Sequence, residues 1–149
     1  MYWTAWQNQT DGNVFMASMD GQNATLLFPN GMISQPNGLA LDYDTDTLYL
    51  IDAQLDIIAR SRLNGSDYTV LHSIINSTLT RIYGQHMDFF RGKLYFGDRF
   101  EDTVYSFDVN AEEKHLVAVA ELKRDPGNVR VVHSSRQPTG DSEFFFVCL

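Results

Sequence analysis

Residues 36–52 read PNGLALDYDTDTLYLID, and the pattern of this stretch decides the fold. Two short runs of apolar and aromatic residues flank an acidic turn, which is typical of paired β-strands and not of helices. The second run ends in YLID (49–52), and related tetrapeptides stand at 2–5 (YWTA) and 95–98 (YFGD). Their Tyr residues are 47 and 46 positions apart, so the chain contains an internal repeat.

Each copy of the repeat contains four short runs separated by Asn, Asp, Gly or Pro. The run that precedes the Tyr tetrapeptide occurs at 36–42, at 82–88 and, in a last copy, at 125–132. Four strands at this period describe a blade of a β-propeller. The first copy lacks its first run, and the last copy shows its first run alone. The sequence therefore predicts an all-β fold with about three and a quarter four-stranded blades in an open arc, roughly half of a closed ring.

The remaining runs follow the same spacing, with one ambiguous segment. Residues 14–17 align with 57–60, and three extra residues of the first copy fall in the loop 7–13. Residues 110–120 begin like a helix with a capping box. The repeat instead aligns 116–117 with the strand at 70–71, so we expect an outer strand there.

Composition excludes several classes of protein. A net charge of −8 argues against a nucleic-acid-binding surface. No stretch approaches the roughly 18 to 20 apolar residues of a membrane span, and residues 1–4 show no signal peptide. The single cysteine, Cys148, excludes a disulfide framework and a four-ligand structural zinc site.

Three Tyr tetrapeptides in register, with their flanking runs, resemble the YWTD (class B) repeats of the low-density lipoprotein receptor family. The resemblance covers residues 2–138 and is greatest to the large lipoprotein receptor-related proteins. It implies that residues 1–138 are the C-terminal half of a six-bladed propeller. Residues 139–149 would be a tail that starts a truncated EGF-like module.

The family resemblance also implies a function. The chain would be a fragment of the extracellular part of a single-pass endocytic receptor, with no catalytic activity. Its partners would be lipoproteins or other extracellular proteins and a neighbouring EGF-like module. No metal or cofactor is expected in this chain, and calcium is expected only in neighbouring modules of the parent.

The residues of interest fall into two groups. Family top-face contacts lie just after the Tyr tetrapeptide and just before the Gly of the first run. We expect a ligand-binding face at these positions: Trp6, Gln7, Asn37, Gln54, Tyr83, Arg99 and Phe100. The tetrapeptide residues themselves are expected to be structural, with Asp acceptors for backbone N–H groups: Tyr2, Trp3, Tyr49, Asp52, Tyr95 and Asp98. Ala5 lacks that acceptor, so the first blade should be held less tightly.

Other polar motifs have simpler explanations. Residues 42–46 (DYDTD) resemble the start of a calcium loop, but Thr47 and Ala53 stand where an EF-hand needs Gly and Glu, so we expect an acidic turn. The four histidines show no metal-ligand spacing, although any could change charge between pH 5 and 8: His72, His86, His115 and His133. Four Asn-x-Ser/Thr sequons are candidates for glycosylation: Asn8, Asn23, Asn64 and Asn76.

One alternative function belongs to a different class. Residues 36–40 and 48–52 also resemble calcium-dependent six-bladed propeller hydrolases of the lactonase type. Such catalysis needs several inward carboxylates or amides around a central metal. Only Asn37 occupies the matching turn here, so the receptor interpretation is favoured.

Overall fold

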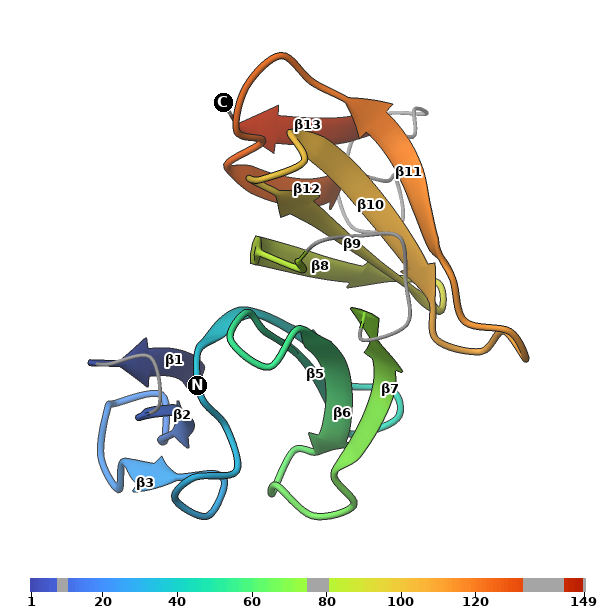
Figure 1. The fold of residues 1–149 in the computed structure, drawn as a ribbon. Helices are drawn as coiled ribbons and strands as arrows, with labels where there is room; N and C mark the ends of the chain where they lie inside the picture. The colour runs from blue at the N-terminus through green and yellow to red at the C-terminus, as the bar shows by residue number, and fades with distance from the viewer. Residues whose placement is uncertain (8–10, 75–80, 133–143, 149) are drawn as a thin grey trace. The chain divides into compact units, whose positions relative to one another are not determined.

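The computed structural model describes residues 1–7, 11–74, 81–132 and 144–148, and all its regular elements are β-strands (Figure 1). The strands are β1 (Tyr2–Trp6), β2 (Gly12–Met16), β3 (Thr25–Leu26), β4 (Pro36–Asp42), β5 (Thr47–Asp52), β6 (Ile57–Arg62), β7 (Thr69–Ser73), β8 (Gly84–Phe90), β9 (Lys93–Asp98), β10 (Thr103–Asp108), β11 (Leu116–Glu121), β12 (Asn128–Val132) and β13 (Phe144–Cys148). The chain forms two compact units, residues 1–83 and 84–149.

Each strand pairs in antiparallel fashion with its neighbour in sequence, so the sheets are meanders. Their orders are β1-β2-β3, β4-β5-β6-β7, β8-β9-β10-β11 and β12-β13. The middle two sheets are complete four-stranded blades, and the first lacks the inner strand. This confirms the predicted all-β repeat, and the strand formed by Leu116–Glu121 confirms that the ambiguous segment is not a helix.

The two complete blades repeat even their irregularities. In β4 and β8 the ladder shifts register near the strand start, between Pro36 and Leu39 and between Gly84 and Met87. A second shift occurs at Ile58/Ala59 in β6 and at Val104/Tyr105 in β10. Register shifts of this kind are β-bulges, which bend a strand and strengthen its twist.

Two details of the predicted alignment are wrong. The run expected at 82–88 forms the strand Gly84–Phe90, two residues later, and the second run of the first copy is displaced by one residue. Tyr2 pairs with Met16, whereas Tyr49 pairs with Arg60. Met16, and not Ala17, is therefore the counterpart of Arg60.

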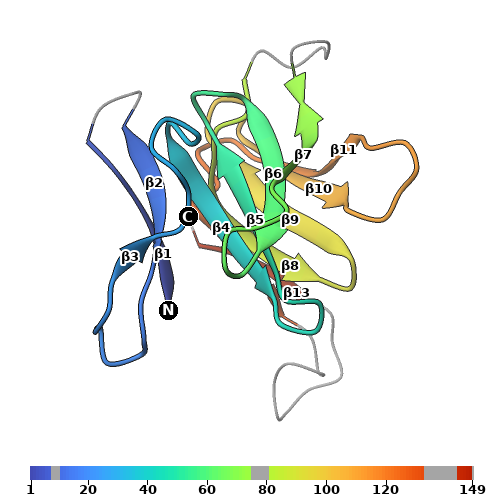
Figure 2. The same ribbon diagram turned by 90° about the horizontal axis from the view of Figure 1, so that it is seen from below.

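The core of residues 1–83 lies between the first two sheets. Eight buried side chains from both sheets and their connections form it: Val14, Leu27, Phe28, Ile33, Leu48, Leu50, Ile57 and Ala59. Leu48 and Leu50 alternate with Tyr49 along β5, so one face of the strand supplies this core. Strands β1 and β2 lie beside β4 (Figure 2). Burying a side chain of this size contributes about 1.5–3 kcal/mol, which makes the cluster the main stabilising contact of the unit.

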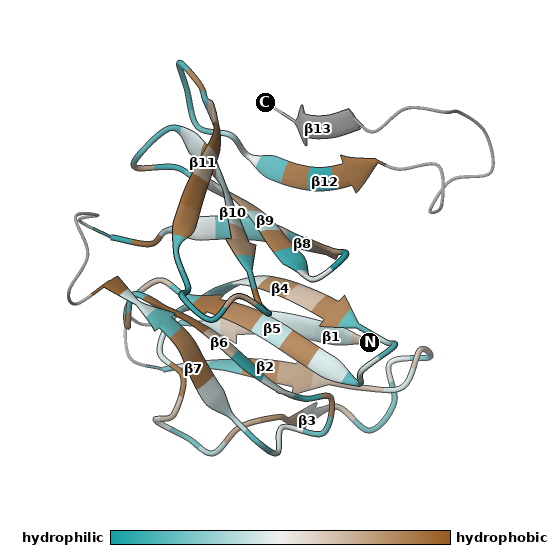
Figure 3. Ribbon diagram, turned by 90° about the vertical axis from the view of Figure 1, so that its right-hand side faces the viewer, coloured by the Kyte–Doolittle hydropathy of each residue, from teal (hydrophilic) through white to brown (hydrophobic). Residues whose placement is uncertain are grey.

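The second unit places β12 against β8 and β9. Polar and apolar residues alternate along β12 (Figure 3), and Val129 and Val131 are buried while Asn128 and Arg130 are exposed. The amide of Val131 donates to Oδ2 of the buried Asp88 at 2.9 Å, which fixes β12 to β8. The sequence predicts that β12 lacks the partners of a complete blade. The structure adds a partner that the repeat does not contain, because β13 pairs with β12 from Asn128–Cys148 to Val132–Phe144.

Glycines allow close approach of the connecting segments in both units. A Cβ at Gly12 would overlap the carbonyl oxygen of Ser34 and come within 2.5 Å of Cδ of Pro36. A Cβ at Gly97 would lie 2.6 Å from Cγ of Pro126. In each unit a glycine of one sheet therefore makes room for the proline that leads into the next.

Candidate functional site

In residues 1–83 the candidate positions gather at one end of the two sheets. Trp6 is the last residue of β1 and is 44% exposed, and Gln7 after it is exposed. Its ladder partner Gly12 contacts Ser34 and Pro36, which begin the next blade. The end of β1 is thus joined directly to the start of β4, where Asn37 is half-buried.

A buried carboxylate builds this end of the second blade. Asp52 is 0% exposed. Its oxygens accept the amides of Ser34 at 2.7 Å and Gln35 at 3.1 Å in the inter-blade connection. They also accept the amides of Gln54 at 3.0 Å and Leu55 at 3.1 Å in the next turn. One side chain therefore positions both the connection before β4 and the turn after β5.

The segment before β8 lies on that same turn. The hydroxyl of Tyr83 accepts a long hydrogen bond from Nε2 of Gln35 at 3.4 Å. Arg81 donates to the carbonyl oxygen of Ala53 at 3.4 Å, and its Nε lies 3.9 Å from Oδ1 of Asp56. Asp56 also accepts the amide of Ile82 at 3.1 Å. Gln54 and Tyr83 are thus brought to the same end of the unit as Trp6 and Asn37.

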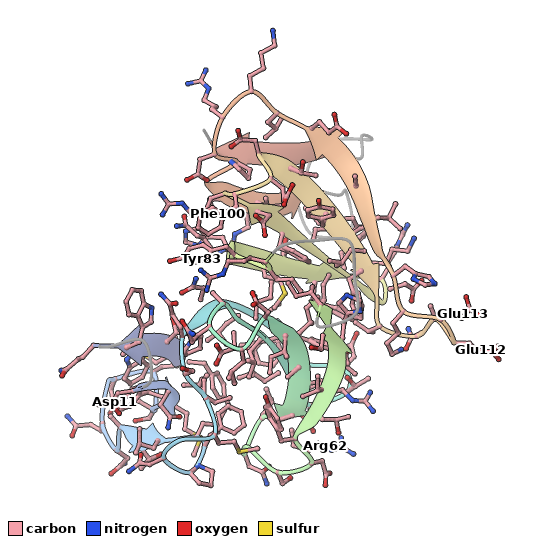
Figure 4. The ribbon with its side chains drawn as sticks, viewed as in Figure 1. Asp11, Arg62, Tyr83, Phe100, Glu112 and Glu113 are labelled. Carbon is pink, nitrogen blue, oxygen red and sulfur yellow. The ribbon has the colours of Figure 1, made fainter. Side chains whose placement is uncertain are left out.

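The second unit repeats the turn with different side chains. Oδ1 of the buried Asp98 accepts the amides of Phe100 at 2.9 Å and Glu101 at 3.2 Å. Nε of Arg99 lies 3.7 Å from Oδ2 of Asp125 in the connection before β12. Both side chains of this pair are nearly half exposed, so it contributes only about 0–1 kcal/mol. Phe100 is 57% exposed, at the opposite end of the sheet from Glu112 and Glu113 (Figure 4).

Each of the first three blades exposes one large apolar side chain at the end of its Tyr strand or in the turn that follows. These are Trp6, Leu55 at 42% exposed, and Phe100. Sequence reasoning missed Leu55, Asp56 and Arg81. Leu55 could have been found by extending the repeat alignment by one residue beyond Gln54. It stands three residues after the Asp of its tetrapeptide and aligns with Glu101 of the next copy. An exposed apolar side chain with polar neighbours is the kind of feature that protein interfaces use.

The remaining candidates are placed as follows. His72 is half-buried, and His86 and His115 are exposed. Nε2 of His115 lies 3.3 Å from Oε2 of Glu113. Asn23 and Asn64 are exposed, whereas Asn8, Asn76 and His133 lie outside the described residues. Residues 43–46 form the predicted acidic turn, with Asp42 accepting the amide of Asp44 and the hydroxyl of Thr45.

Two features are absent from the residues that the structure describes. Within the ranges that the structure describes, no group of three or more His, Cys, Asp or Glu side chains could hold a metal ion. In the same ranges there is no helix long and apolar enough to cross a membrane.

Comparison with known proteins agrees with this description. Residues 1–43 match the family model of the low-density lipoprotein receptor repeat class B. The chain is 29% identical over 143 residues to the vitellogenin receptor of Solenopsis invicta, covering 95% of this chain and 8% of that protein. It is 27% identical over 138 residues to the vitellogenin receptor Yl of Drosophila melanogaster, covering 93% and 6%. The chain therefore spans less than a tenth of the length of these relatives.

Solved structures show the same fold. A chain of the nidogen/laminin complex superposes with a TM-score of 0.67 at 22% identity, over 86% of this chain and 46% of that one. A gluconolactonase from Xanthomonas campestris superposes with a TM-score of 0.57 at 20% identity, over 85% and 40%. These similarities identify the sheets as part of a β-propeller. The predicted family resemblance is confirmed by the repeat match and by the receptor relatives.

Proposed function

We propose that this chain, which carries class B repeats of the low-density lipoprotein receptor family, binds a protein ligand in the extracellular part of an endocytic receptor. The observation that carries the proposal is the similarity to vitellogenin receptors over 95% of the chain. Those relatives are named for the protein that they bind, so vitellogenin is the first ligand to test. The proposed neighbours in the parent protein include an EGF-like module.

The exposed turn residues are the proposed contacts. Trp6 and Leu55 lie at one end of the first unit, with Asn37, Gln54 and Tyr83 as polar or amphipathic neighbours. Arg99 and Phe100 hold the matching positions in the second unit. Trp, Tyr and Arg are the side chains that most often dominate the energy of protein interfaces, because they combine a large contact area with polar groups.

Binding of vitellogenin to the immobilised chain tests these contacts. Trp6→Ala and Phe100→Ala should each weaken binding about tenfold or more, the effect expected of an interface hot spot. Tyr43→Ala is the matched control, because Tyr43 is 71% exposed in the turn at the opposite end of the second blade. Equal loss in Trp6→Ala and Tyr43→Ala would contradict the assignment of the face. Absence of binding by the unmodified chain would contradict vitellogenin as its ligand.

The absence of catalysis is part of the proposal and needs its own test. The similarity to a gluconolactonase is the observation that favours the alternative, a calcium-dependent hydrolase. We propose that calcium belongs only to neighbouring modules of the parent and that this chain holds no cofactor. Titration of calcium into the chain by calorimetry should give no tight binding, and added calcium should produce no hydrolysis of gluconolactone. A tight site together with hydrolysis would establish the enzyme instead.

A further inference from the structure

Three Asn-Gly pairs occur in the chain, and the structure places them in different surroundings. They are Asn30-Gly31, Asn37-Gly38 and Asn64-Gly65. Asn is a chemically labile side chain, and a following Gly lets the backbone nitrogen approach it because no Cβ is in the way. The three pairs share these two residues, so their surroundings in the folded chain can be compared directly, with urea as the reference for the effect of the flanking sequence.

The pair Asn30-Gly31 lies in a solvent-exposed turn between β3 and β4. The amide of Met32 donates to the carbonyl oxygen of Pro29 at 3.2 Å, which closes the turn. Gly31 has a φ of 81°, and no atom lies within 4 Å of the position that its Cβ would take. Both residues are exposed. Among the hydrogen bonds of the described residues, none uses the amide of Gly31 or the side chain of Asn30.

The pair Asn64-Gly65 is also in a turn, but both reacting groups are engaged. Oδ1 of Asn64 accepts the amide of Ser66 at 3.0 Å. The amide of Gly65 donates to the carbonyl oxygen of Arg62 at 2.9 Å. A Cβ at Gly65 would overlap the carbonyl oxygen of Leu27, so this turn is packed against the first blade.

The third pair is protected in another way. Asn37 and Gly38 belong to β4 and lie in its β-bulge, between the ladder pairs Pro36–Asp52 and Leu39–Leu50 that hold the strand on both sides. Gly38 is buried and Asn37 is half-buried. Rotation of this backbone toward the geometry of a five-membered ring would break the inner strand of a complete blade.

We propose that Asn30 is a site of spontaneous deamidation in the folded protein, and that Asn37 and Asn64 are protected. The amide nitrogen of Gly31, after losing its proton to solvent, attacks Cγ of Asn30. The new N–Cγ bond closes a succinimide ring, and the side-chain nitrogen leaves as ammonia. Water then opens the ring at either carbonyl and leaves aspartate or isoaspartate, so the net change is one water consumed and one ammonia released.

The position of Asn30 gives this modification a structural consequence. Isoaspartate inserts a methylene group into the backbone just before Ile33, which is 1% exposed in the core. Ile33 is followed by Ser34 and Gln35, whose amides donate hydrogen bonds to Asp52. A longer backbone at residue 30 changes the spacing between the buried Phe28, which Asn13 holds by hydrogen bonds, and the segment from Ile33 to Gln35. Aspartate at the same position adds a charge but leaves the backbone length unchanged.

The test is incubation of the full 149-residue chain at neutral pH and body temperature, followed by peptide mapping with fragmentation that separates isoaspartate from aspartate. In the folded chain Asn30 should deamidate at least about tenfold faster than Asn37 or Asn64, since protection follows local opening. In concentrated urea the three sites should react at similar rates. Asn30→Ser should remove the main product, and Asn64→Ser should leave the rate at Asn30 unchanged.

Three results would overturn the proposal. The first is equal deamidation of Asn64 and Asn30 in the folded chain. The second is a folded-state rate at Asn30 as low as that of the other two sites. The third is the same preference for Asn30 in urea, which would assign it to the flanking sequence and not to the fold. For the structural consequence, the isolated isoaspartate form should melt at a lower temperature than Asn30→Asp, and equal melting temperatures would contradict it.

Discussion

The first two blades differ at the position of the tetrapeptide Asp. In the second blade, the buried Asp52 accepts four backbone amides and joins the turn to the inter-blade connection. In the first blade, the same position is the exposed Ala5. The first blade contains instead the stacking of Trp3 on Phe15, with ring centroids 5.5 Å apart, and the buried Asn13. The carboxylate is thus one solution to a requirement of the blade and is not obligatory in each copy.

Asn13 shows how the first blade satisfies its backbone without the signature acid. Its Oδ1 accepts the amides of Val14 at 2.8 Å and Phe28 at 3.3 Å, and its Nδ2 donates to the carbonyl oxygen of Phe28 at 3.0 Å. An amide can accept and donate at the same time, whereas a carboxylate only accepts. Asn13 therefore ties β2 to the segment after β3, while Asp52 ties a turn to a connection.

The largest effect should follow loss of the Asp52 carboxylate. Asp52→Ala leaves four amides without their acceptor in a buried site and should lower the free energy of unfolding by roughly 3–5 kcal/mol. Urea denaturation measures the loss, and hydrogen exchange should show faster exchange at Ser34, Gln35, Gln54 and Leu55. Asp44→Ala, in the exposed acidic turn, is the control and should change stability by less than about 0.5 kcal/mol. Unchanged exchange at those four amides would refute the role given to Asp52.

The two close-approach glycines should differ in how well they tolerate alanine. Gly12→Ala forces a methyl group onto a backbone carbonyl oxygen, so we expect a loss of about 2–3 kcal/mol. The Cβ of Gly97→Ala meets the ring of Pro126, whose pucker can adjust, and lies 3.4 Å from Cγ2 of Val129. Since no backbone atom is among these contacts, a loss of about 1–2 kcal/mol is expected. Thermal melting of both variants checks the order. A larger loss in Gly97→Ala would mean that the connection before β12 is the more rigid one.

Alkaline pH should weaken the first unit through Tyr68. Burial, with a smaller effect of the Asp52 charge, raises the pKa of Tyr68 from 10.0 to about 12. The folded state therefore favours the protonated phenol. This contribution to stability is complete below pH 10 and is lost as the pH rises through about 12. Tyr68 packs edge-on against Phe28, with ring centroids 5.5 Å apart. The difference between the melting temperatures of the unmodified chain and of Tyr68→Phe should be smaller at pH 9 than at pH 11. Tyr43→Phe is the control, because Tyr43 is exposed.

The smallest effect should come from restoring the signature in the first blade. Ala5→Asp supplies the missing carboxylate, but Ala5 is exposed, so the new side chain keeps its hydration. The stability should change by less than about 1 kcal/mol in either direction. A gain similar in size to the loss in Asp52→Ala would show that the first blade already presents the amides that a carboxylate needs.

Much of the fold was predictable because each copy of the repeat contains the same series of strand-forming runs, so that one copy supports the prediction for the next. The segment 110–120 is predicted as a helix when taken by itself, but its residues from Leu116 onward belong to a strand in the structure, and only the alignment with the previous copy predicted this. The partner of β12 was not predictable, since residues 144–148 match no part of the repeat. Leu55 was missed because the alignment for ligand contacts stopped at Gln54.

The amino-acid order alone determined the blade period, the strand class and the positions of the turns, because alternation of apolar residues and turn-forming Asn, Asp and Gly act locally. Only the tertiary structure decided which side chains form the hydrogen bonds that hold the backbone at those positions. Asp52 and Asn13 each bind backbone groups of a segment distant in sequence. The reactivity assigned to Asn30 and denied to Asn64 depends on hydrogen bonds to residues that the Asn-Gly pair itself does not specify. Such contacts depend on how sheets pack, and packing is set by the whole chain at once.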